Sequence, residues 1–232
     1  MKKYTACALL LISAFQPATG ASGESFDNWI EHADKEKSFA QKVVFYGNAI
    51  TAWQDNDGGL KKGLAYERLG VCRIALDHLD EAAADLKSAL DLNPHSFSAR
   101  AALAHVYTLQ NKCDMALGEI EEAKKDIPEG QRAPLYYQCG LINLLCRKND
   151  KAAEADFTKA IKTAPKAKHM DALRKSYLKR GVIRCRKGKF ASGISDIKAA
   201  GKISSPDNEY LFELGICYRQ KEDFKKALAN LI

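Results

Sequence analysis

The sequence contains none of the short motifs that commonly mark a catalytic or phosphate-binding site. It has no glycine-rich phosphate-binding loop and no His-Glu-x-x-His pattern for a catalytic zinc ion. Its five histidines are scattered, without the spacing of a nucleophile and its base. Acidic pairs such as Asp80-Glu81 and Glu121-Glu122 are typical of exposed helix ends and faces. We therefore expect no catalytic residues and no cofactor, and we predict that the protein is not an enzyme.

Strand-like alternation and the glycine fingerprint of a Rossmann-type fold are also missing. What the sequence has instead is a repeat, in which the same residues recur in the same order. The step is 34 residues from Leu69 to Leu103, from Ala82 to Ala116, from Ala89 to Ala123 and from Pro94 to Pro128. A period of this length predicts stacked supersecondary units.

The residues of the repeat predict a pair of closely packed helices. Gly70, Ala82 and Ala89 have little or no side chain, so two helices can approach closely at these positions. Leu86 fills the space that remains, at helical spacing from Ala82 and Ala89. Pro94 has no N–H group and cannot continue a helix, so it ends the second helix and leads the chain into the next unit.

A 34-residue repeat with small residues at fixed helical positions resembles the tetratricopeptide repeat, a helix-turn-helix unit. The resemblance implies an all-helical, right-handed superhelical solenoid of five to six hairpins. In the third repeat the spacing from Gly140 to Pro165 is one residue longer than the template, which predicts an insertion near residues 147–150. The expected units are a degenerate N-terminal hairpin at 22–62 and a repeat domain at 63–232, with repeats at about 63–96, 97–130, 131–166, 174–207 and 208–232, the last stopping part-way along its second helix.

The extreme N-terminus has the pattern of a secretory signal peptide. Lys2-Lys3 precede the short apolar run 6–15, and small residues follow as far as Ala21. The run is about half of the ~20 residues that a membrane-spanning helix needs. We therefore predict a signal peptide at 1–21, no transmembrane segment after cleavage, and a bacterial protein that is periplasmic or secreted.

Six cysteines follow the signal peptide, and an oxidising compartment permits up to three disulfides among them. Cys139 and Cys146 lie seven residues apart on one helix, a rise of roughly 10 Å that exceeds disulfide reach. Cys72 and Cys217 occupy a repeat position that is normally alanine in the family, which implies small buried side chains. Cys113 is expected at the start of the second helix of one repeat, and Cys146 at the end of the first helix of the following repeat. This pair is therefore the favoured disulfide. No Cys-x-x-Cys or Cys/His cluster suggests a metal site.

Positive charge is concentrated in one segment. Residues 159–189 contain twelve Lys or Arg and one acidic residue, in a chain whose formal net charge is +7. Such a block attracts anionic partners. Nucleic acid does not suit an exported protein, and no aromatic platform accompanies the block. Membrane headgroups, envelope polymers or an acidic protein are therefore the favoured partners. The other interpretation is a solvated helix face. The residues proposed for this basic patch are Lys168, Arg174, Lys175, Lys179, Arg184, Arg186, Lys187 and Lys189.

The resemblance also implies a binding groove, because the first helices of tetratricopeptide repeats line the concave side of the solenoid. Most groove positions in this chain are apolar, and an exposed apolar strip is typical of a binding surface. The alternative is that an additional terminal helix fills the groove. The expected groove residues are Leu64, Val71, Ile74, His105, Tyr137, Leu141, Leu144, Leu178, Val182, Phe212 and Ile216.

Some family members grip a C-terminal carboxylate with Lys, Asn and Arg, but Val71, His105, Leu141 and Val182 stand where those members place asparagine. Two functions are therefore predicted. The first is an exported scaffold or adaptor that binds a protein or peptide mainly through apolar contacts. The alternative is a cell-envelope, anionic-polymer or membrane-surface binder that acts through residues 159–189.

Overall fold

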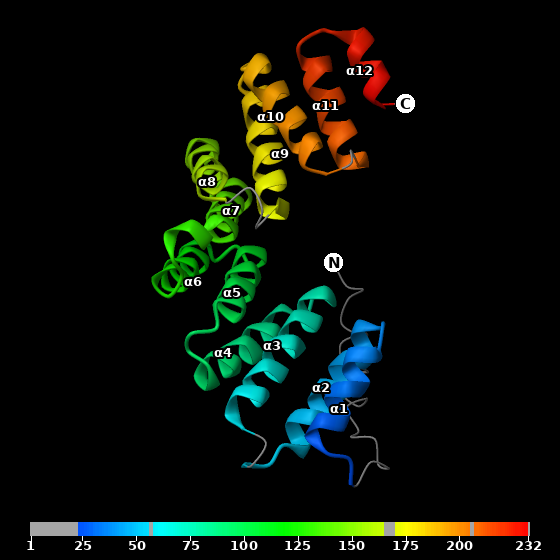
Figure 1. Ribbon diagram of the computed structural model, residues 1–232, viewed down its shortest axis with the longest axis vertical. Helices are drawn as coiled ribbons and strands as arrows, with labels where there is room; N and C mark the ends of the chain where they lie inside the picture. Colours follow the sequence, from blue (N-terminus) through cyan, green and yellow to red (C-terminus); the bar gives the residue numbers. More distant parts are fainter. Residues whose placement is uncertain (1–22, 56–57, 165–169, 205–206, 232) are drawn as a thin grey trace, which may run out of the picture. The chain divides into compact units, whose positions relative to one another are not determined.

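The computed structural model describes residues 23–55, 58–164, 170–204 and 207–231, which form helices and no strand (Figure 1). The signal peptide predicted at 1–21 lies outside the described residues. No helix in the described ranges is long and apolar enough to cross a membrane. The chain divides into two compact parts, an N-terminal part of residues 1–94 and a C-terminal part of residues 95–232.

Two helical hairpins make up the N-terminal part. The first consists of α1 (Phe26–Lys35) and α2 (Phe39–Ala52), and the second of α3 (Gly59–Ala75) and α4 (Leu79–Leu92). Ser25 and Ser38 cap α1 and α2, because each side chain accepts a hydrogen bond from a backbone N–H in the first turn. Residues 26–52 therefore form one helical hairpin.

Four further hairpins make up the C-terminal part. In each, the first helix packs against the second, and α7 continues through one π-helical turn at Ile142–Cys146 before the chain turns. The hairpins are α5 (Phe97–Leu109) with α6 (Cys113–Lys125), α7 (Ala133–Leu141) with α8 (Asp150–Thr163), α9 (Met170–Arg186) with α10 (Phe190–Ile203), and α11 (Asn208–Gln220) with α12 (Phe224–Leu231). The expected all-helical class of five to six hairpins is confirmed, with six among the described residues.

Glycine at one repeat position lets the two helices of a hairpin come into contact. A Cβ atom added at Gly70, Gly140 or Gly181 would lie within 3 Å of a side chain on the second helix. The closest contacts would be 2.8 Å to Leu86, 2.5 Å to Phe157 and 2.7 Å to Ile197, respectively. All three of these apolar side chains are fully buried, so the glycines are required by the packing of the core.

The π-helical turn absorbs the extra residue of the third repeat. In the first repeat the turn between the helices places Asp77, seven residues after Gly70, in the left-handed region. In the third repeat the equivalent left-handed residue is Lys148, eight residues after Gly140. The backbone N–H of Arg147 donates to the carbonyl of Ile142, five residues earlier. The insertion therefore lies before Lys148, in the π-helical turn at Ile142–Cys146, a few residues earlier than the range 147–150 near which it was expected.

Candidate protein-binding face

Six apolar side chains lie on the first helices of three neighbouring hairpins in the C-terminal part. The helices α7 and α11 each contact α9, so residues on these helices can contribute to one surface. Phe212 is 57% exposed, and the other five are partly buried. The set, called here the apolar face, comprises Tyr137, Leu141, Leu144, Val182, Phe212 and Ile216.

A buried cluster supports the α7 side of the apolar face. Tyr137, Leu141 and Leu144 pack against a core cluster that includes Phe157 and Ile183. The ring centroids of Tyr137 and Phe157 are 5.8 Å apart in a tilted arrangement. Because Phe157 is fully buried, the three residues of the α7 side rest on the packed core of the hairpin.

The pKa of Tyr137 reflects its burial and the charged groups around the apolar face. Burial is the main cause that raises the pKa of Tyr137 to about 12; the nearby carboxylates of Glu209 and Asp171 contribute to this rise, and Arg174 opposes it. The hydroxyl group therefore stays neutral at physiological pH. The same carboxylates belong to α11 and α9, so charged groups from both neighbouring helices surround this tyrosine on α7.

Ion pairs join α9 to α11 at the edge of the face. Lys179 Nζ lies 2.8 Å from a Glu209 oxygen, and an Arg174 guanidinium nitrogen lies 3.0 Å from Asp207. Each pair is partly exposed and contributes little by itself. Together they help to hold α9, which carries Val182, against α11, which carries Ile216.

One predicted groove residue is not accessible. Leu178 has no exposed surface and belongs to the core cluster with Ile197 of α10 and Leu214 of α11. Because both of these helices contact α9, they cover the side of α9 that carries Leu178. The assignment of Leu178 to the groove is therefore wrong, and its role is to hold the fourth and fifth repeats together.

The remaining predicted groove residues lie on other first helices. His105 is exposed on α5. In the N-terminal part, Leu64 and Val71 of α3 are each 46% exposed, and Ile74 is partly buried. These residues are available for contact in their own parts of the chain.

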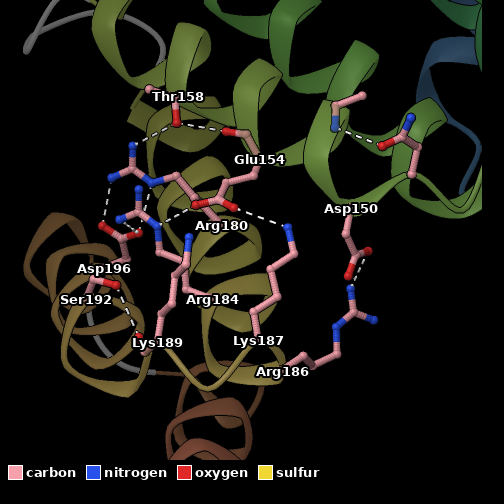
Figure 2. A network of polar contacts seen from close by, with 12 residues as sticks. Asp150, Glu154, Thr158, Arg180, Arg184, Arg186, Lys187, Lys189, Ser192 and Asp196 are labelled. Atoms are coloured by element: carbon pink, nitrogen blue, oxygen red, sulfur yellow. Dashed lines mark hydrogen bonds and ion pairs between the residues drawn. The ribbon is translucent and has the colours of Figure 1, made fainter.

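Several cations of the basic segment are paired with carboxylates, as Figure 2 shows for those at the end of α9. Asp196 is buried and accepts two hydrogen bonds from Arg180, at 2.7 and 2.8 Å, and one from Arg184 at 2.8 Å. Glu154 of α8 accepts from Arg184 at 2.9 Å and from Lys187 at 3.3 Å. These bonds hold α8, α9 and α10 together.

Most of the other residues proposed for the basic patch are also paired with carboxylates. Arg186 pairs with Asp150 at 2.8 Å, and Lys175 pairs with Asp171 at 2.7 Å. Arg174 and Lys179 form the pairs at the edge of the apolar face. Lys168 lies outside the described residues, and Lys189 is exposed with no ion pair among the described residues. The net count of +11 in this segment therefore overstates the positive charge that a ligand would meet.

Two disulfides tie adjacent repeats of the C-terminal part together. Cys113 is bonded to Cys146, with Cα atoms 5.7 Å apart, and Cys185 is bonded to Cys217, with Cα atoms 5.5 Å apart. The interpretation of Cys217 as merely a small buried side chain is therefore wrong. Cys72 and Cys139 are free and buried, and burial raises the pKa of both thiols.

The sequence contained a signal for the second disulfide. Cys185 and Cys217 both lie on first helices, 32 residues apart, so they are close to one repeat period from each other. A spacing near one period brings residues of adjacent first helices side by side. Among the described residues no group of three or more His, Cys, Asp or Glu side chains is arranged to hold a metal ion.

Comparison with known families and structures identifies the repeat. Residues 64–96 match the family model of the tetratricopeptide repeat. No curated protein matches the sequence significantly. Taken with the hairpins described above, the match shows that the chain is a tetratricopeptide repeat protein in its fold.

Several solved structures have the same fold. BtubC from P. vanneervenii has a TM-score of 0.69 and 16% identity, covering 84% of this chain and 89% of that one. PilF from Pseudomonas aeruginosa has a TM-score of 0.63 and 17% identity, covering 72% of each chain. YrrB, described as a TPR protein with an unusual peptide-binding site, has a TM-score of 0.51 and 19% identity, covering 80% and 88%. At these identities the likeness concerns the fold, which is generally that of non-enzymatic scaffolds for protein–protein interaction.

Proposed function

We propose that this protein is an exported scaffold that binds a protein or peptide partner on the apolar face. The observation that carries the proposal is Phe212, an aromatic side chain that is 57% exposed on the same helix as Ile216. Aromatic anchors of this kind dominate the binding energy of many protein interfaces. Repeat proteins of this fold use such surfaces for recognition.

The chemistry of the face favours a partner that is held by apolar contacts. Five of its six residues carry no polar side-chain atom, and the hydroxyl group of Tyr137 stays neutral. An amphipathic helix or an extended segment with apolar side chains meets these requirements. The ion pairs at the edge, Lys179–Glu209 and Arg174–Asp207, add polar contacts around an apolar centre.

Export is supported by the cysteine chemistry. Disulfides persist in oxidising compartments and are rare in the cytosol, and the C-terminal part has two of them. The signal-peptide pattern at 1–21 gives the route. Mass spectrometry of the protein from a periplasmic fraction tests this step. A mature N-terminus near residue 21 is expected, whereas an intact Met1 in the cytosolic fraction alone would contradict it.

The binding proposal is tested by two matched substitutions. Phe212→Glu places a charge on the apolar face, whereas Phe224→Glu makes the same change on the second helix of the same repeat, at a side chain that is 66% exposed. Wild-type and variant proteins serve as bait in affinity capture from a periplasmic extract, at low salt and at about 0.5 M salt. The higher salt concentration screens the interactions between exposed charges.

We expect a discrete partner that is retained at high salt, lost with Phe212→Glu and kept with Phe224→Glu. Equal loss with both variants, or capture by all three proteins only at low salt, would contradict the proposal. The alternative function, binding of an anionic envelope component through residues 159–189, predicts the second of these results. The pairing of Arg180, Arg184 and Lys187 with carboxylates argues against that alternative.

A further inference from the structure

A small pocket lies between α2 and α3 in the N-terminal part. Its volume is about 220 Å³. Its apolar walls come from the rings of Phe39 and Tyr46 and from Val71, and the free thiol of Cys72 also lines it. Pockets that bind whole small molecules are usually larger, roughly 300–1,000 Å³. The size of this pocket therefore fits one side chain of a bound protein segment.

The polar groups of Tyr46 and Arg68, which line the pocket, already have partners. The Tyr46 hydroxyl donates a hydrogen bond to Asp34 Oδ1 at 3.0 Å, and an Arg68 nitrogen donates to both Asp34 oxygens at 2.7 and 2.9 Å. Burial and the contact with Asp34 raise the pKa of Tyr46 to about 12, so this hydroxyl remains neutral. An apolar group can therefore enter without leaving a buried polar atom unpaired.

Two side chains of the pocket wall leave apolar surface in contact with water. Phe39 is 48% exposed and Val71 is 46% exposed, and they come from different helices. Cys72, by contrast, is only 4% exposed and belongs to the core cluster with Leu69. The pocket thus has a buried inner wall and an open apolar mouth, and covering that mouth removes apolar surface from water.

Lys42 is the cation of the pocket that has no ion pair among the described residues. Its side chain is partly buried on α2 and lines the pocket. Arg68 is committed to Asp34. Glu67 also lines the pocket and carries a negative charge, which disfavours a ligand with several negative charges.

We propose that this pocket is a recognition site for an extended protein segment in which an apolar side chain stands beside a carboxylate. The apolar side chain fills the cavity between Phe39 and Val71, and the carboxylate pairs with Lys42. The site belongs to the N-terminal part, whereas the apolar face belongs to the C-terminal part. Failure of one proposal therefore leaves the other to its own test.

The probe is a blocked tetrapeptide, acetylated and amidated, with leucine followed by glutamate between two glycines. A second peptide has glutamine in place of the glutamate, and a third has alanine in place of the leucine. Binding to the whole protein is followed by NMR of the Val71 methyl groups, which line the pocket. The variants are Lys42→Gln and the matched control Lys87→Gln, an exposed lysine of α4.

We expect the leucine–glutamate peptide to shift the Val71 methyl signals in a saturable way and the alanine peptide to have no effect. Lys42→Gln should weaken binding roughly threefold, as expected for one partly exposed ion pair. The glutamine peptide should bind wild type and Lys42→Gln equally, which isolates the pairing with Lys42.

Three results would overturn the proposal. One is the absence of a Val71 shift with any peptide. Another is equal affinity for the glutamate and glutamine peptides in the wild-type protein. The last is an equal loss of affinity with Lys87→Gln and Lys42→Gln, because this would show a general attraction between the protein and an acidic peptide rather than a specific site.

Discussion

Removal of the Asp196 carboxylate is expected to destabilise the C-terminal part more than removal of any exposed carboxylate. Asp196 is buried and accepts three hydrogen bonds from Arg180 and Arg184. With Asp196→Ala, both guanidinium groups lose their shared partner while remaining largely buried, with side chains 11% and 22% exposed. Breaking a buried ion pair in this way costs about 3–5 kcal/mol.

The lower end of that range is expected here. Arg184 keeps its bond to Glu154, and Arg180 keeps its bond to the Thr158 hydroxyl at 3.2 Å. These remaining bonds limit the penalty, so the expected loss is about 3 kcal/mol. The matched control is Asp171→Ala, which breaks an exposed i,i+4 pair with Lys175. Such a pair contributes about 0.3–0.5 kcal/mol.

Urea denaturation followed by circular dichroism compares the two variants with the wild-type protein. Hydrogen exchange at the amides of α9 and α10 then shows whether the loss is local to these helices. If Asp196→Ala and Asp171→Ala differ by less than about 1 kcal/mol, the arginines do not depend on Asp196. In that case Arg180 and Arg184 would have charge available for an anionic ligand, and the structural role assigned to them would be refuted.

Three further outcomes are expected. Gly140→Ala should destabilise the protein by about 1–2 kcal/mol, because overpacking costs ~1–3 kcal/mol and outweighs the helix-propensity gain, whereas Gly118→Ala, with open space around its Cβ, should stabilise it by up to ~1 kcal/mol in thermal melts. Replacing Cys185 and Cys217 by alanine should lower the free energy of unfolding by roughly 3–4 kcal/mol in the oxidised protein, from the entropy of a closed loop of this length, and by much less under reducing conditions. Burial raises the pKa of Asp85 from 3.8 to about 6, so its stabilising contribution is complete below pH 3.8 and is lost as the pH rises through about 6. In urea denaturation between pH 4 and 7, the free energy of unfolding should therefore depend less on pH for Asp85→Asn than for the wild-type protein. An unchanged dependence would contradict the raised pKa.

Most of the fold could be predicted from the 34-residue period of the repeat. The small residue at Gly70 predicted a close helix contact, and the structure places the buried side chain of Leu86 directly against it. The period also predicted an extra residue in the third repeat. Its position could not be predicted, because a π-helical turn absorbs an insertion inside a helix without any proline or glycine to mark it.

The candidate site was less predictable, because exposure depends on neighbouring helices. Leu178 occupies a groove position of the repeat, yet α10 and α11 cover it. The charge of residues 159–189 was similarly misleading. Glu154 and Asp196 both lie outside this segment in the sequence, and the fold brings them to Arg184. A local count of charges cannot include carboxylates that come from other helices.

The junctions between repeats differ in the chemistry that holds them, and this has a mechanical consequence. Cys113 begins α6 and is bonded to Cys146 at the end of the next first helix, whereas Asp150 begins α8 and forms an ion pair with Arg186 at the end of its next first helix. The same location is therefore closed by a covalent bond in one junction and by an ion pair in the next.

A pulling force along the repeats would act on these junctions in series. The disulfides Cys113–Cys146 and Cys185–Cys217 limit how far their repeats can separate, since a covalent bond does not yield at forces that rupture ion pairs. The junction between α8 and α9, held by Asp150, Glu154 and their partners, is then the compliant element of the C-terminal part. The apolar face spans that junction, with Leu141 on one side and Val182 on the other. Tension would therefore deform the face at a defined place.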